Sequence, residues 1–131
     1  GVQATDMFAL LEHDPTPPTG APPAAPLHWD LLVAVAGMER VPTWRLTANP
    51  LAAAAPIPAE RIGDHRPLYL TYEGPVSGDR GCVRRLDGGP ADVLALDGPR
   101  LLVVFHGQRL RGRWEVVAGG TGHVVRRVAC P

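Results

Sequence analysis

Two short runs hold most of the residues in this chain whose types and spacing could do chemistry. The first reads Leu-His-Trp-Asp-Leu from Leu27 to Leu31, and the second, Asp64 to Gly74, contains another His and a Tyr. Because residues i and i+2 of a strand point to the same face, His28 and Asp30 would present a nitrogen and an oxygen side by side. That spacing suits two neighbouring positions on one metal ion, or a simple hydrogen bond between the two side chains at a strand surface.

A metal site needs a third protein ligand, and two histidines are candidates. His13 ends an apolar run that begins at Met7, and His65 lies downstream. Two His and one carboxylate leave coordination positions open for water or substrate, as a catalytic metal requires. Taken singly, His65 is also typical of a turn, and Tyr69 is also typical of strand packing.

The elements that must position these residues are short strands. Fifteen prolines and fifteen glycines leave little room for long helices. Alternating apolar residues predict strands over 7–11, 27–35, 68–73, 93–96, 101–105, 109–117 and 123–129. Six to eight short strands predict an all-β fold with minor α content, a compact antiparallel β-barrel, since closure removes exposed edges.

The length of 131 residues predicts one domain over 1–131. The stretch 14–26 is rich in Pro and Ala and lacks periodicity, so it predicts an extended surface loop within this domain. A second Pro- and Ala-rich stretch, 50–58, predicts a loop with one helical turn at most.

Composition excludes several classes of function. Thirteen basic and thirteen acidic residues give a net charge of zero, which argues against bulk electrostatic capture of nucleic acid. No apolar run approaches the roughly 20 residues that span a bilayer. Cys82 and Cys130, in a chain without a recognisable secretory leader, predict reduced thiols and a cytoplasmic protein. No dimerisation pattern stands out, so we expect a monomer.

The order of the runs resembles the 3′-phosphoesterase domain of bacterial DNA ligase D and its stand-alone relatives. That family has a His-Tyr-Asp-Leu-Arg-Leu-Glu run followed by a Trp, and Leu27 to Leu32 and then Trp44 fill those places. Its EDHPLEYADFEG stretch aligns without a gap with Gly63 to Gly74. Its closing LHGKRLKGRWELV strand resembles His106 to Val117, so the resemblance covers residues 7–117.

The resemblance implies a β-barrel that binds Mn²⁺, or another divalent ion such as Zn²⁺. It implies removal of 3′-phosphates or 3′-ribonucleotides from DNA or RNA–DNA ends in repair, with ligase or polymerase repair proteins as partners. His13, His28 and Asp30 would be the metal ligands, and His65 and Tyr69 would sit at the scissile phosphate.

Two departures from the family pattern bear on this expectation. His13 precedes His28 by fifteen residues, where the family has six, so the Pro-rich stretch would be an insertion that returns the chain to the site. Leu32 stands where the family has an Arg, which leaves Arg45, Arg61 and Arg66 as substitutes for phosphate binding.

Two other functions are consistent with the same residues. The Leu at position 32 favours a catalytically weakened relative that binds metal, DNA ends or a repair protein. An iron site made of His28, Asp30 and His106 would instead indicate a barrel oxygenase, although the 64–74 run would then have no role.

Overall fold

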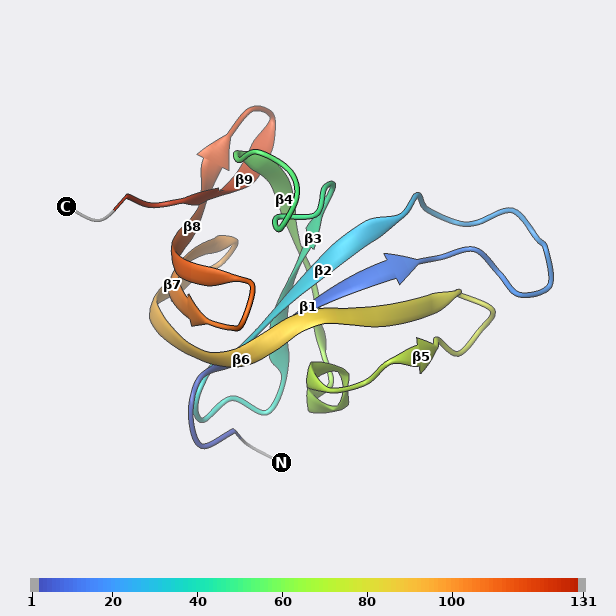
Figure 1. Ribbon diagram of the computed structural model, residues 1–131, viewed down its shortest axis with the longest axis horizontal. Coiled ribbons are helices and arrows are strands. Elements are labelled where there is room, and N and C mark those ends of the chain that lie inside the picture. The colour runs from blue at the N-terminus through green and yellow to red at the C-terminus, as the bar shows by residue number, and fades with distance from the viewer. Residues whose placement is uncertain (1–2, 130–131) are drawn as a thin grey trace.

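Nine strands and one short 3₁₀ helix build residues 3–129, the part of the chain that this computed structural model describes (Figure 1). The strands are β1 (Met7–Asp14), β2 (His28–Ala34), β3 (Val41–Leu46), β4 (Ile57–His65), β5 (Gly74–Pro75), β6 (Cys82–Asp97), β7 (Arg100–His106), β8 (Arg111–Gly119) and β9 (Gly122–Arg127). The helix, η1, covers Pro67–Leu70. No helix within residues 3–129 has the length and hydropathy that crossing a membrane requires.

The strands close into an antiparallel barrel. Their order is β1-β2-β3-β4-β9-β8-β7-β6, and β6 returns to pair with β1, so eight strands form a ring. Strand β5 adds only two residues to the edge of β6. The all-β antiparallel barrel that the sequence predicts is therefore confirmed.

Strand β6 is sixteen residues long and belongs to both halves of the barrel. Residues 82–90 pair with β1, and residues 91–97 pair with β7. Figure 1 shows β6 curving from the side of β1 and β5 toward β7. The hairpin from β6 to β7 pairs Asp97 with Arg100, so Gly98 and Pro99 form its two-residue turn, in which Gly98 has a positive φ of 56°.

Two apolar clusters lie on opposite faces of β1, β2 and β3. The first contains residues of all eight ring strands, among them Phe8, Leu31 and Trp44, and fills the barrel. The second lies on the other face and joins Leu11 and Leu32 to residues such as Leu70 of η1. The segment after β4 thus covers part of the barrel wall, and these strands are buried on both faces.

The sequence-based prediction of a strand over 68–73 is wrong. Pro67 stands in the first turn of η1, where its fixed φ favours a helical start and its missing N–H leaves no bond unmade. The Tyr69 and Thr71 amides then donate to the Arg66 and Leu68 carbonyls, which closes the short helix.

Strands β3 and β4 were not among the predicted strands. Pro42 lies inside β3, and a proline within an apolar run argues against a strand. The structure accommodates it with a register shift between Val41 and Thr43. Strand β4 contains Glu60, Arg61 and Asp64, which hide its alternation, and it begins within the stretch 50–58 that was predicted as a loop.

Cys82 is exposed at the start of β6 and is a free thiol. Cys130 lies outside the described residues, so that both thiols are reduced stays a prediction.

Candidate metal centre

The hairpin of β1 and β2 brings His13 to His28 despite the long connection between them. The register of the two antiparallel strands sets His13 directly opposite His28, and their ring centroids are 4.6 Å apart. Residues 15–27 lie outside both strands, and most of their side chains are exposed. Because strand register places His13, the length of the Pro-rich loop does not change its distance from His28.

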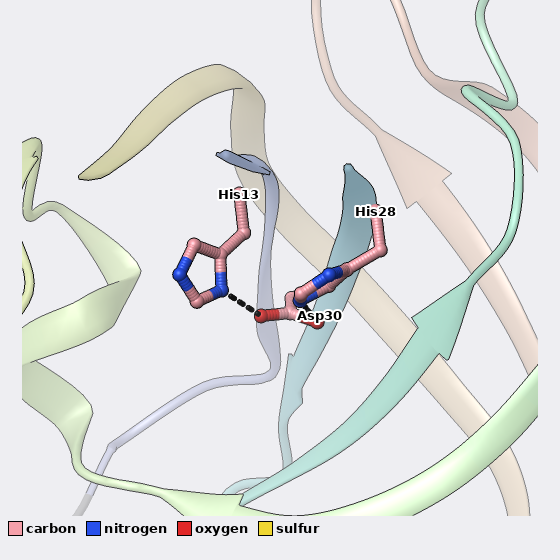
Figure 2. Close-up of side chains that lie close together, drawn as sticks. All are labelled: His13, His28 and Asp30. Atoms are coloured by element: carbon pink, nitrogen blue, oxygen red, sulfur yellow. Dashed lines mark ion pairs between the residues drawn. The ribbon is translucent and has the colours of Figure 1, made fainter. Parts of the chain in front are cut away.

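Three predicted ligands form one cluster. His13, His28 and Asp30 each offer one ligand atom, and these atoms lie within 4.8 Å of one another. His28 Nε2 is 3.6 Å from Asp30 Oδ1, and His13 Nδ1 is 3.9 Å from Asp30 Oδ2. Figure 2 shows both rings facing the carboxylate. These separations exceed hydrogen-bond length, so the simple His28–Asp30 hydrogen bond is not formed.

Backbone carbonyls fix the tautomers of both rings. His28 Nδ1 donates to the Pro26 carbonyl at 3.0 Å, and His13 Nε2 donates to the Arg80 carbonyl at 2.8 Å. A carbonyl oxygen can only accept, so each of these nitrogens carries the proton. The other nitrogen of each ring therefore turns a lone pair toward Asp30, as in metal sites whose histidines are oriented by an outer hydrogen bond.

The hydrogen-bond acceptors at the centre of this cluster are buried and have no donor. The His28 and Asp30 side chains are each 4% exposed. His28 Nε2 and Asp30 Oδ1 are buried and have no hydrogen-bond partner. Burial lowers the pKa of His28 and outweighs the hydrogen bond to Pro26, which raises it. A neutral imidazole beside a buried carboxylate satisfies neither, whereas a divalent cation between them satisfies both.

A third imidazole reaches the same carboxylate. His65, the last residue of β4, donates Nδ1–H to the Gly63 carbonyl at 3.2 Å and places Nε2 3.9 Å from Asp30 Oδ2. Its side chain is 23% exposed, the most open of the three histidines. The Tyr69 ring stands edge-on to it, with centroids 5.5 Å apart. His65 and Tyr69 thus lie together beside the cluster, where either a ligand or a substrate contact is geometrically open to His65.

The cluster opens into a cavity of about 380 Å³. His13, Asp30, His65 and Tyr69 line it, together with four arginines: Arg40, Arg45, Arg66 and Arg80. Asp30 and Asp64 are the only acidic residues among the lining residues. Cationic side chains outnumber anionic ones two to one even without a metal ion, so the cavity favours an anionic ligand.

Arg45 and Arg66, two of the three predicted phosphate-binding residues, belong to this cavity. Arg45 is the cross-strand partner of Asp30, and its Nε is buried without a hydrogen-bond partner. The Arg66 guanidinium lies 5.7 Å from the centre of the Tyr69 ring.

Arg61, the third, does not line the cavity. Its guanidinium lies over Trp44, donates to the Gly98 carbonyl and pairs with Asp64. Strand register accounts for this placement, because Arg61 is the partner of Trp44 and Trp44 fills the barrel.

Two arginines of the cavity, Arg40 and Arg80, were not singled out from the sequence. Arg40 donates to the Asp64 carbonyl, and Arg80 donates to the carbonyl and hydroxyl of Ser77. The turn that carries Arg80 sits tightly on the end of β1, because a Cβ at Gly81 (φ +82°) would overlap the Asp14 carbonyl oxygen. The Gly-Asp-Arg-Gly pattern of this turn is the only local signal that could have indicated Arg80.

Leu32 and His106 lie apart from the cluster. Leu32 is fully buried in the second apolar cluster, so no polar group takes the place of the family's Arg at this position. His106 bonds Asp92 at 2.7 Å across the β6–β7 hairpin. Within residues 3–129, the only group of three or more metal-ligating side chains contains His13 and not His106. The structure therefore does not bring together the ligand set of the alternative oxygenase.

Comparisons with known proteins identify no family for this chain. No protein-family model and no curated protein sequence matches the chain. The resemblance to the 3′-phosphoesterase domain therefore remains a prediction, and the case for a function rests on the residues of the cavity.

Proposed function

We propose that this protein is a divalent-metal-dependent phosphoesterase that acts on 3′-phosphate or 3′-ribonucleotide ends of DNA in repair. One observation carries the proposal: imidazoles locked by backbone carbonyls aim lone pairs at a buried carboxylate, at the base of a cavity lined with arginines. A cation site and an anion site adjoin there, which is the arrangement that phosphoryl chemistry uses.

The donor set supports a divalent ion. Two neutral imidazole nitrogens and one carboxylate oxygen suit Mn²⁺, Zn²⁺ or Fe²⁺, and they leave coordination positions open. When bound, such an ion neutralises charge on the phosphoryl oxygens. We propose Mn²⁺, on the resemblance described above.

The cavity arginines support a phosphate ligand. Arg45 lines the cavity beside Asp30, so its guanidinium is placed to donate to an oxygen of the ligand. Arg66 and Arg80 lie on the segment that follows β4 and line the same cavity. Together these side chains can hold a tetrahedral anion next to the histidine cluster and shield it from bulk water.

His65 and Tyr69 are the groups best placed for proton handling. His65 Nε2 faces the site while Nδ1 is held by Gly63, so the ring can take up a proton at Nε2 and pass it to the leaving oxygen. Tyr69 can donate a hydrogen bond to a phosphate oxygen from the cavity wall.

A binding function without turnover is the second candidate. Leu32 favours it, because its burial leaves one phosphate contact of the resembling family without a replacement at that position. Such a protein would hold metal and a DNA end, or a repair ligase or polymerase, and release no product.

Release of inorganic phosphate from a 3′-phosphorylated primer–template separates the two candidates. We expect release in Mn²⁺ and none in EDTA. Bound Mn²⁺ without any release over long incubation would favour the binding protein.

A variant tests the role of His65. His65→Ala should retain Mn²⁺ and lower the release rate by at least about a hundredfold, the usual contribution of a positioned general acid. His106→Ala is the matched control, because His106 also lies beside an Asp carboxylate but is more exposed and lies outside the cavity. Loss of metal from His65→Ala would instead assign His65 as a fourth ligand.

A further inference from the structure

A second cavity adjoins the first along the outer face of the sheet. It has a volume of about 760 Å³, within the roughly 300–1,000 Å³ typical of ligand pockets. Residues of β3 and β4 form one wall, and the turn from β8 to β9, with Gly119 to Gly122, forms another.

Strand register connects this cavity to the metal cluster. Leu11, Asp30, Arg45 and Glu60 form one cross-strand row over β1, β2, β3 and β4. Directly paired residues of antiparallel strands point to the same side, so Arg45 and Glu60 share the face of Asp30. Arg45 lines both cavities.

An ion pair marks the same boundary. Arg61 lines the second cavity and Asp64 lines the first, and Arg61 Nη2 lies 3.2 Å from Asp64 Oδ1. The two cavities are therefore adjacent on β3 and β4. Arg45 and the Arg61–Asp64 ion pair lie at the boundary between them.

The second cavity has the chemistry of a nucleotide site. Pro58, Pro99 and Val124 offer apolar surface to a base or sugar, and Arg45, Arg61 and His123 offer positive or hydrogen-bonding groups to phosphates. Glu60 is the only acidic side chain among its lining residues. Because Arg45 lines both cavities, its cationic side chain is placed to contact an anionic ligand at their junction.

We propose that the second cavity binds the nucleotides adjacent to the terminal 3′-phosphate, so that the strand runs from the metal cluster over Arg45 toward the β8–β9 turn. This inference rests on the proposed function, since it needs the terminal phosphate in the first cavity. It makes the protein selective for polynucleotide ends over small phosphomonoesters, because only a polynucleotide fills both cavities.

A charge placed in the second cavity tests this path. Thr47 lines it, is exposed and does not line the first cavity. Thr47→Glu should raise the KM for a 3′-phosphorylated oligonucleotide by about fivefold or more, the effect of one like-charge contact with a phosphodiester near the surface. Thr47→Gln has the same size without the charge and should leave the KM near that of the wild type.

Two further measurements make the outcome specific. Hydrolysis of p-nitrophenyl phosphate, which occupies the first cavity alone, should be unchanged in Thr47→Glu. Leu94→Glu adds the same charge at an exposed position that lines neither cavity, and should leave both substrates unaffected. An unchanged oligonucleotide KM in Thr47→Glu, or an equal loss in Leu94→Glu, would overturn the proposed path and leave the phosphoesterase proposal intact.

If the wild type hydrolyses neither substrate, the proposed catalytic function is wrong. A binding measurement then tests the proposed path of the strand. Fluorescence anisotropy of a labelled 3′-phosphorylated oligonucleotide in Mn²⁺ gives its Kd for the same variants. Weaker binding in Thr47→Glu than in Thr47→Gln supports the path, and equal binding overturns it.

Discussion

Replacing Asp30 by Asn should stabilise the metal-free protein and reduce the further stabilisation that metal binding gives. The carboxylate is 4% exposed, and its Oδ1 has no hydrogen-bond donor. An amide at this position keeps the shape of the side chain, removes the buried charge and can offer an N–H to the lone pair of His28 Nε2, 3.6 Å from the present Oδ1.

The size of the effect follows from the burial of these atoms. A buried polar atom without a partner costs about 1–3 kcal/mol, and more when it is charged. In EDTA, we therefore expect Asp30→Asn to raise the free energy of unfolding by about 1–3 kcal/mol. For a chain of this size each kcal/mol moves Tm by roughly 3–5 °C, so the metal-free variant should melt visibly higher than the wild type.

Excess Mn²⁺ should stabilise the wild type more than the variant. A ligand at a hundred times its Kd stabilises the folded state by about 2.7 kcal/mol, and the wild type should gain this amount. The variant lacks the anionic ligand and should gain little, because changes even to groups outside a metal's own ligands weaken binding by about 10- to 100-fold.

Thermal unfolding followed by circular dichroism, in EDTA and in excess Mn²⁺, measures both effects. Asp92→Asn is the matched control, because it alters the exposed Asp92–His106 pair and should not change the response to Mn²⁺. The reasoning fails if Asp30→Asn melts below the wild type in EDTA, or if Mn²⁺ raises Tm equally in both proteins.

Two other predictions concern the loop between β1 and β2 and the carboxylate of Asp87. Replacing the exposed residues 18–24 with a short Gly-Ser linker should leave Mn²⁺ affinity within about threefold by calorimetry, since β1–β2 register places His13; a larger loss would show that the loop itself positions the ligand. Burial alone would raise the pKa of Asp87, but backbone N–H bonds from Leu110, Arg109, Gly88 and Gln108 outweigh it and lower the pKa. The stability contributed by Asp87 is therefore present above its unfolded pKa and lost as pH falls through the folded pKa. Urea unfolding should show Asp87→Asn less stable by about 1–3 kcal/mol at pH 7, with a smaller difference at pH 3, and an equal difference at both pH values would contradict this account.

The sequence predicted those parts of the fold that obey local rules. Strands β1, β2 and β7 are apolar or alternating, and their existence follows from that pattern. Pro42 and Pro67 misled the prediction in opposite ways. The first is tolerated in β3 by a register shift, and the second begins a helix where aromatic and β-branched residues favoured a strand.

From residue spacing alone, the site was predictable only where its chemistry is local. His28 and Asp30 share a face because they are two residues apart in one strand. Nothing in the spacing of His13 reveals that it lies opposite His28, since this depends on a register set by two whole strands. Arg40 and Asp87 depend on partners more than twenty positions away, Asp64 and the 108–110 turn, so no short motif could indicate either residue.

The residues of the site lie on two parts of the fold that differ in local stability. His13, His28 and Asp30 lie on strands of the barrel ring, whereas Arg66, Tyr69 and Arg80 lie on residues 66–81, which β5 ties to the sheet by only two residue pairs. A weakly tied segment opens at lower free energy than a closed ring, so its amides should exchange with deuterium sooner than those of β1 and β2. The hydrogen bond from His13 to the Arg80 carbonyl joins the two parts, and through it metal binding can slow that exchange.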